Sequence, residues 1–173
     1  KYRMDEASQA SNFIFPGKNV SAILQDLAMG VPLEVLEPAL RRAASLPGSP
    51  GEAKGALMDL EELVEREVSR GHLSRSHARG HRWAELLATL WYIQDPLSWP
   101  LASVVGMRCL RRQGEMDSEG DYAEYASVMQ RLSNSLGAGM MDTEHLLASL
   151  EDGDLHIPEA EECLQDYLRR AED

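Results

Sequence analysis

The stretch WAELLATLWYIQDPLSWP, which runs from Trp83 to Pro100, decides the fold class of this 173-residue chain. Its apolar residues recur at intervals of three and four, which is the spacing along one face of an α-helix. That face consists of Trp83, Leu86, Leu87 and Leu90. Asp95 and Pro96 then predict a break, because Asp is a favourable helix N-cap and Pro a favourable first helical residue. The stretch therefore predicts a helix, a sharp stop and a second helical start.

The same periodicity extends to both sides of this stretch, whereas the two-residue alternation typical of strands is missing. Glycine and proline mark the joints, and the clearest loop is PGSPGEAKG, residues 47–55. Leu33 begins one apolar stripe and Gly137 closes another. The sequence predicts an all-α fold, a compact bundle of about seven or eight short amphipathic helices. They cover about residues 20–30, 32–43, 56–70, 74–94, 101–110, 122–136, 143–150 and 158–171.

Length and local composition favour one domain. A chain of 173 residues buries enough surface to fold without metal ions or disulfides. Residues 1–12 show little apolar periodicity and predict a flexible N-terminal arm. The remainder, residues 13–173, is then a single all-helical domain.

The segment from Leu101 to Leu110 is apolar almost all round, which predicts a helix buried at the centre of the bundle. Arg108 lies on the same face of this helix as Val104 and Val105. A buried guanidinium group must be paired with a carboxylate or with backbone carbonyls. We therefore expect Arg108 to be a structural buried charge, holding two helices together through an internal salt bridge.

The net charge of −12 limits the classes of partner. It argues against binding to nucleic acid or to an anionic membrane, because neutralising phosphates requires a basic surface. No uncharged run approaches the ~20 residues that a membrane-spanning helix needs. Cys109 and Cys163 fall on apolar helical faces and do not form a disulfide framework, so we expect an intracellular, cytoplasmic protein.

The segment SRGHLSRSHARGHRW, residues 69–83, reverses this charge locally. Five arginines fall between Arg66 and Arg82 against the acids Glu65 and Glu67. Arginine pairs well with carboxylates and is enriched at interface hot spots. We expect a docking site for an acidic surface or peptide, flanked by Trp83 and Trp91 unless both tryptophans belong to the core. Its expected residues are Arg70, Arg75, His77, Arg79, His81 and Arg82.

Sites with chemistry of their own find little support in the sequence. The Gly-x-Ser-x-Gly, P-loop and Gly-x-Gly-x-x-Gly patterns are missing. His77, His81 and Glu85 share a helical face, but a straight row along one helix cannot enclose a metal ion. Two acidic stretches, residues 115–129 and 150–159, lack the ligand spacing of a calcium loop. We therefore expect no metal and no cofactor.

One catalytic alternative rests on two short patterns, REVSRGH at residues 66–72 and RSHARGH at residues 75–81. Each places a histidine after an arginine and five further residues. This spacing resembles the Arg-x(4–6)-His signature of the HEPN family, which is all-helical and includes RNases. The resemblance implies that Arg66 with His72, or Arg75 with His81, would act on RNA. The arginine would stabilise phosphate charge and the histidine would move a proton.

The sequence favours a non-enzymatic function: an adaptor, regulatory or subunit domain that contacts another protein through its Arg/His-rich segment. The helical RNase is one alternative. A second is an acidic mimic of nucleic acid, which would depend on clusters such as Glu159, Glu161 and Glu162.

Overall fold

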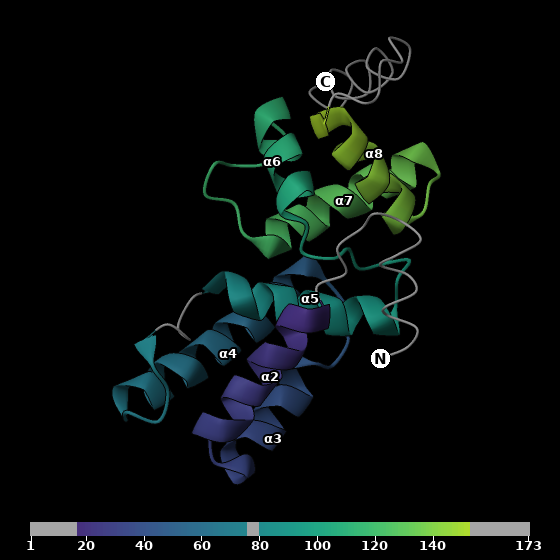
Figure 1. The fold of residues 1–173 in the computed structure, drawn as a ribbon. Helices are drawn as coiled ribbons and strands as arrows, with labels where there is room; N and C mark the ends of the chain where they lie inside the picture. Colours follow the sequence, from purple (N-terminus) through teal and green to yellow (C-terminus); the bar gives the residue numbers. More distant parts are fainter. Residues whose placement is uncertain (1–16, 76–79, 153–173) are drawn as a thin grey trace.

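The fold is all-α, as expected. The computed structural model describes residues 17–75 and 80–152, and within these ranges it contains seven α-helices and no strand (Figure 1). The helices are α2 (Gly17–Gly30), α3 (Leu33–Ala43), α4 (Pro50–Ser69), α5 (Gly80–Gln94), α6 (Val104–Gln113), α7 (Tyr122–Leu136) and α8 (Met140–Asp152). The expected helix at residues 158–171 and the expected arm at residues 1–12 lie outside the described residues.

The helices form two groups that pack on each other. In one group α3 packs on α4, and α2 and α4 both pack on α5; in the other, α8 packs on α6 and α7. Figure 1 shows α2 to α5 on one side of the molecule and α6 to α8 on the other. The contact of α4 with α7 joins the groups.

Short polar residues set the helix starts, and one of them overturns an expected loop. The Ser49 hydroxyl accepts a hydrogen bond from the amide of Glu52, so α4 already begins at Pro50. The prediction of a loop over residues 47–55 is therefore wrong beyond Ser49. A serine cap followed by proline is a strong local start signal, and it outweighs Gly51 and Gly55 inside the helix.

The centre of the molecule is also not where the sequence predicted it. The helix expected from Leu101 begins only at Val104, where the Ser103 hydroxyl accepts from the amide of Gly106. Val104 is 70% exposed, so α6 is buried on one face and not all round. The expectation of a central buried helix is wrong because the apolar run is divided. Leu101 packs from the connection, and only the later residues turn with the helix.

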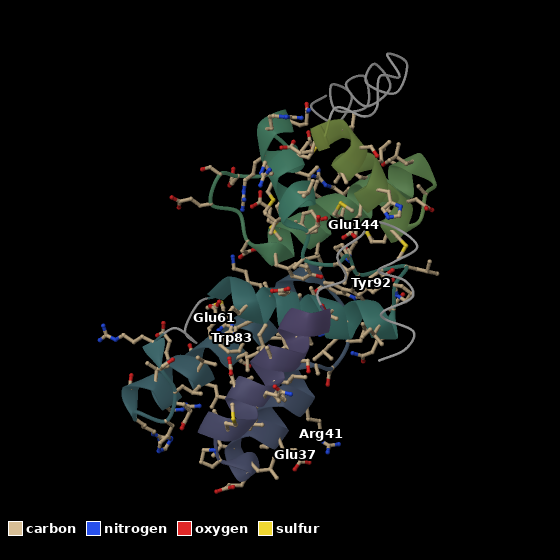
Figure 2. All side chains as sticks on the ribbon, in the orientation of Figure 1. Glu37, Arg41, Glu61, Trp83, Tyr92 and Glu144 are labelled. Carbon is tan, nitrogen blue, oxygen red and sulfur yellow. The ribbon has the colours of Figure 1, made fainter. Side chains whose placement is uncertain are left out.

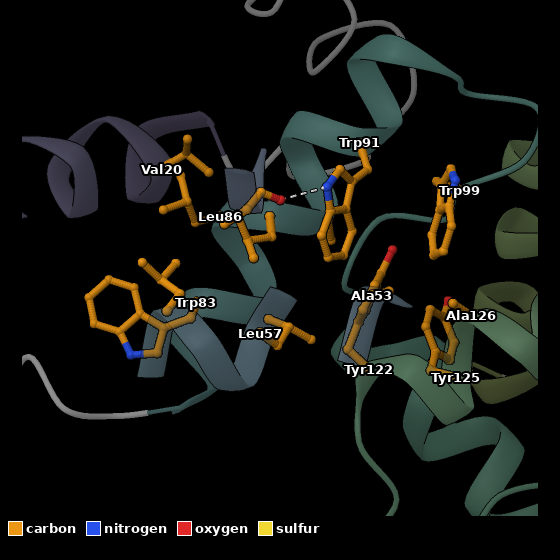
Figure 3. Packing of buried hydrophobic residues seen from close by; sticks show 14 of the residues in the cluster. Val20, Ala53, Leu57, Trp83, Leu86, Trp91, Trp99, Tyr122, Tyr125 and Ala126 are labelled. Atoms are coloured by element: carbon orange, nitrogen blue, oxygen red, sulfur yellow. Dashed lines mark hydrogen bonds between the residues drawn. The ribbon is translucent and has the colours of Figure 1, made fainter. Parts of the chain in front are cut away.

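An aromatic stack lies where the two helical groups meet (Figure 3). The ring of Trp91 on α5 lies 5.5 Å from that of Trp99 and 5.9 Å from that of Tyr122 on α7, between centroids. The Trp91 indole donates a 3.0 Å hydrogen bond to the Ala43 carbonyl, and the Tyr122 hydroxyl donates one of 2.7 Å to the Pro100 carbonyl. The stretch Trp83–Pro100 therefore supplies both a helix and much of this stack.

Candidate functional site

The Arg/His-rich segment lies at the carboxyl end of α4, the turn after it and the start of α5. The structure describes the side chains of Arg66, Arg70, His72, Arg75 and Arg82. His77, Arg79 and the side chain of His81 lie outside its described part.

The basic side chains at the end of α4 surround the carboxylate of Glu67. Its side chain is completely covered, although Arg66, Arg70 and His72 around it are each about half exposed. One carboxylate oxygen, Oε1, accepts a 2.7 Å hydrogen bond from Nη1 of Arg70 and lies 4.0 Å from Nε of Arg66. The other, Oε2, lies 2.7 Å from Nδ1 of His72. Two guanidinium groups and one imidazole ring therefore approach the same carboxylate.

This arrangement keeps Glu67 ionised. The hydrogen bond with His72 holds the pKa of Glu67 below its ordinary value, and the charge of Arg70 acts in the same direction, whereas burial acts against both. An ionised Glu67 in turn fixes the orientation of the imidazole ring and of the Arg70 guanidinium.

A glycine turn places His72 over Glu67. Gly71 adopts a left-handed conformation with φ of 78°, which ends α4. The amides of His72 and Leu73 then donate to the Glu67 carbonyl at 2.9 and 3.3 Å, so the chain folds back over the last turn of the helix. The sequence predicted this stop at Gly71 but not that it would bring His72 onto Glu67.

The same turn packs against the end of α2. Leu73 is buried, and a Cβ atom at Gly30 would collide with its side chain and lie 2.7 Å from the His72 carbonyl oxygen. The joint between α2 and α3 therefore lies beside the basic cluster. Met29 and Leu33 of this joint are 81% and 68% exposed.

We call Met29, Leu33, Arg66, Arg70 and His72 the α4-end surface. Sequence reasoning missed its apolar part and assigned Leu33 to the inner face of α3. Leu33 is the first residue of that helix and is exposed, whereas Leu36, three residues later, is buried. The signal that could have located the surface is Gly30, a residue that permits close backbone approach.

The other expected docking residues divide into exposed and engaged ones. Arg75 is exposed. Arg82 is not: its Nη2 donates a 3.1 Å hydrogen bond to Oδ2 of Asp26, which joins α5 to α2. Trp83 and Trp91 are buried and belong to the core, so neither flanks a docking site as exposed surface.

Arg108 is not a buried charge, and that prediction is wrong. Its side chain is 64% exposed, and Nη1 lies 3.9 Å from Oε1 of Glu151. Arg112 approaches the other oxygen of Glu151 at 3.2 Å. The salt bridges do join α6 to α8, as expected, but from the surface. The buried positions of α6 are Gly106, Cys109 and Leu110.

Other reactive groups of the described residues are engaged or covered. Burial raises the pKa of the Cys109 thiol, which favours an unreactive form, and Cys163 lies outside the described residues. Within residues 17–75 and 80–152 no three His, Cys, Asp or Glu side chains are grouped so as to hold a metal ion.

Comparison with known proteins finds no matching family model, no similar curated protein and no similar solved structure. Among the helices described, none combines the length and the apolar character needed to cross a bilayer. The class that the fold defines is an all-α helical bundle.

Proposed function

We propose that this protein is an interaction domain, an adaptor, regulator or subunit, that docks an acidic segment of another protein on its α4-end surface. The observation that carries the proposal is the convergence of Arg66, Arg70 and His72 on the covered Glu67. The two guanidinium groups outnumber the one carboxylate, which gives this cluster a positive charge on a body of net charge −12.

The cluster is suited to binding because its basic groups are oriented before a partner arrives. Each arginine uses part of its guanidinium group on Glu67, and 54% and 55% of the side chains of Arg66 and Arg70 remain exposed. Docking therefore immobilises fewer side-chain rotamers than it would with free arginines. The remaining N–H groups suit a carboxylate of the partner.

The apolar side chains beside the cluster complete the surface. Met29 and Leu33 offer exposed apolar area next to cationic groups, and interfaces commonly combine such area with arginine. Arg75 adds charge, whereas Arg82 is already paired with Asp26. The proposed surface is thus narrower than the whole segment 66–82. The proposed setting is the cytoplasm, and nucleic acid is not the proposed partner.

The test is affinity capture from the native host with quantitative mass spectrometry. The test variant combines Leu33→Asp, Arg66→Gln and Arg70→Gln. Its control combines Arg41→Gln, Arg131→Gln and Leu97→Asp, which makes equal changes at exposed positions elsewhere. We expect a protein that binds the wild type and the control but is depleted at least about tenfold by the test variant, a loss of ~1.4 kcal/mol. If every captured protein is recovered in equal amounts with the test variant and with the control, the proposed surface is wrong.

One observation favours the helical RNase as a second candidate. Arg66 and His72, the pair implied by the HEPN resemblance, both contact Glu67. A carboxylate on Nδ1 orients an imidazole so that Nε2 can act as a general base. For this candidate we expect cleavage of single-stranded RNA that His72→Ala abolishes. RNA left intact by the purified wild-type protein would reject it without touching the docking proposal.

A further inference from the structure

A carboxyl group is buried in the interior of the α6–α8 group. Glu144 on α8 is 2% exposed. Its Oε1 accepts a 3.3 Å hydrogen bond from the Tyr125 hydroxyl of α7, and the backbone of Leu101 supplies another. Its Oε2 is buried without a hydrogen-bond partner among the described residues. The packing of α8 therefore encloses an oxygen that no donor of the described residues satisfies.

No arginine, lysine or histidine among residues 17–75 and 80–152 pairs with this carboxyl group. Among the described residues, the titratable groups that interact with Glu144 are the phenols of Tyr122 and Tyr125 on α7 and of Tyr92 on α5. Figure 2 labels Glu144 and Tyr92. The arginines of α6 are engaged elsewhere. Arg108 and Arg112 pair with Glu151, seven residues further along α8, and Arg111 donates hydrogen bonds to the carbonyls of Asp117 and Gly120.

The described side chains around Glu144 are also closely packed. A Cβ atom at Gly106 would lie 2.6 Å from the Tyr125 hydroxyl oxygen, so α6 leaves just enough room for that side chain. The Ser103 hydroxyl also interacts with the Tyr125 hydroxyl. The Glu144 side chain is thus almost completely shielded from solvent while α8 is packed in place.

An ionised carboxylate in such a place is strongly unfavourable. Burial accordingly raises the pKa of Glu144 to about 8, and it raises the pKa of Tyr122 and of Tyr125 as well. The neutral carboxyl group is the form that is compatible with α8 packed in place, which we call the seated state of α8. Once α8 separates, water stabilises the carboxylate.

We infer that Glu144 makes the seating of α8 depend on a proton. With the carboxyl group neutral, α8 packs on α6 and α7. Loss of the proton releases α8 and uncovers the buried face of α6, which includes Cys109 and Leu110. This proton-dependent packing of α8 is separate from the α4-end surface and does not rest on the proposed docking function.

The direction of the effect follows from proton binding. Between the ordinary pKa of 4.5 and the raised value of about 8, the seated state holds a proton that the released state lacks. Each pH unit in this window favours release by up to tenfold. From pH 6 to pH 8 the population of released α8 should rise by roughly 50-fold.

The first experiment measures release through the thiol of Cys109, which is completely buried on α6. Its reaction with a disulfide reagent is followed from pH 6 to pH 8 in the Cys163→Ser background. The rates are divided by those of the urea-unfolded chain to remove thiolate formation. We expect the corrected rate to rise roughly 50-fold in the parent and to stay flat in Glu144→Gln.

Leu147→Ala is the matched control, because it weakens the seating of α8 without removing a titratable group. It should react faster at every pH while keeping the slope of the parent. The inference is overturned if Glu144→Gln keeps the parental slope, or if the parent has none.

A second measurement needs only the wild type and covers the case that Glu144→Gln does not fold. Amide hydrogen exchange, corrected for its intrinsic pH dependence, should show opening of α8 that increases from pH 6 to pH 8, whereas α4 stays protected. Equal changes in both helices, or no change in α8, would refute a proton-dependent release of α8.

Discussion

A single carboxylate organises the proposed docking surface, and it does so against the usual tendency of glutamate to be exposed. Glu67 is completely covered because Arg70 and His72 lie over it, not because it points into the apolar core. Part of this site was predictable. The clustering of arginines located the end of α4, and the adjacency of Arg66 to Glu67 is visible in the sequence. The return of His72 onto Glu67 depends on the conformation of Gly71, and no spacing rule contains it.

Glu67 should make the protein sensitive to acid. Its pKa is lowered in the folded state, so its contribution is complete above its ordinary pKa and is lost as the pH falls through the lowered value. We expect the stability of the wild type to fall more between pH 5 and pH 3 than that of Glu67→Gln. Urea unfolding at several pH values measures this difference. Parallel profiles of the two proteins would show that the contacts of Glu67 do not favour its ionised form.

Gly30 and Gly55 form a matched pair of glycines at which alanine should act in opposite directions. At Gly30 a Cβ atom would meet Leu73 and the His72 carbonyl, so Gly30→Ala should cost about 1–3 kcal/mol through overpacking. At Gly55, within α4, a Cβ atom meets nothing within 4 Å, and Gly55→Ala should stabilise by about 0.5–1 kcal/mol. Chemical denaturation tests both. A tolerated Gly30→Ala would mean that the α2 end and the 72–73 turn are not in close contact.

At the scale of the secondary-structure element, the sequence predicted where each helix lies along the chain better than it predicted which face of the helix is buried. The apolar stripe predicted for α7 is buried at Tyr122, Tyr125, Met129 and Leu132, whereas its last member, Leu136, is 42% exposed. Gly137 ends the helix, as predicted, and adopts a left-handed conformation there. Apolar periodicity and capping depend on residues that are close in sequence, so they can be recognised without knowing which elements pack against the helix. The exposed side chains of Leu33 and Arg108 show the limit, because the rotation of a short helix depends on what packs against it.

The start of α4 offers a test at this scale. Ser49 caps the helix, and the Glu52 carboxylate accepts a 2.8 Å hydrogen bond from the amide of Gly48. Ser49→Ala should destabilise the protein by about 1 kcal/mol, whereas Ser49→Asp, which keeps the cap, should have little effect. Thermal unfolding followed by circular dichroism compares the two. An equal loss in both variants would argue that α4 does not depend on this cap.

At the scale of the whole molecule, two carboxyl groups act on stability from opposite ends of the pH range. The lowered pKa of Glu67 costs stability in acid, and the raised pKa of Glu144 costs stability as the pH rises from 4.5 towards about 8. We expect maximal stability at mildly acidic pH. Glu144→Gln should remove the decline on the alkaline side and be more stable than the wild type at pH 8.

Urea titrations across pH 4 to pH 9 measure this profile. A wild type that gains stability steadily from pH 5 to pH 8 would contradict the role given to Glu144. The glutamate itself was visible in the sequence at a helical position, but its burial was not, because α5, α7 and residues 101–103 meet on it only in the folded chain.

The aromatic stack between the helical groups has a spectroscopic consequence. All three tryptophans are buried. Trp91 and Trp99 lie at the seam, the region where the two helical groups meet, while Trp83 lies within the group formed by α2 to α5. Any loosening of the seam would let water reach Trp99 and shift part of the indole emission to longer wavelength, with Trp83 left as an internal reference. The chain thus carries its own optical probe of whether its two halves stay together.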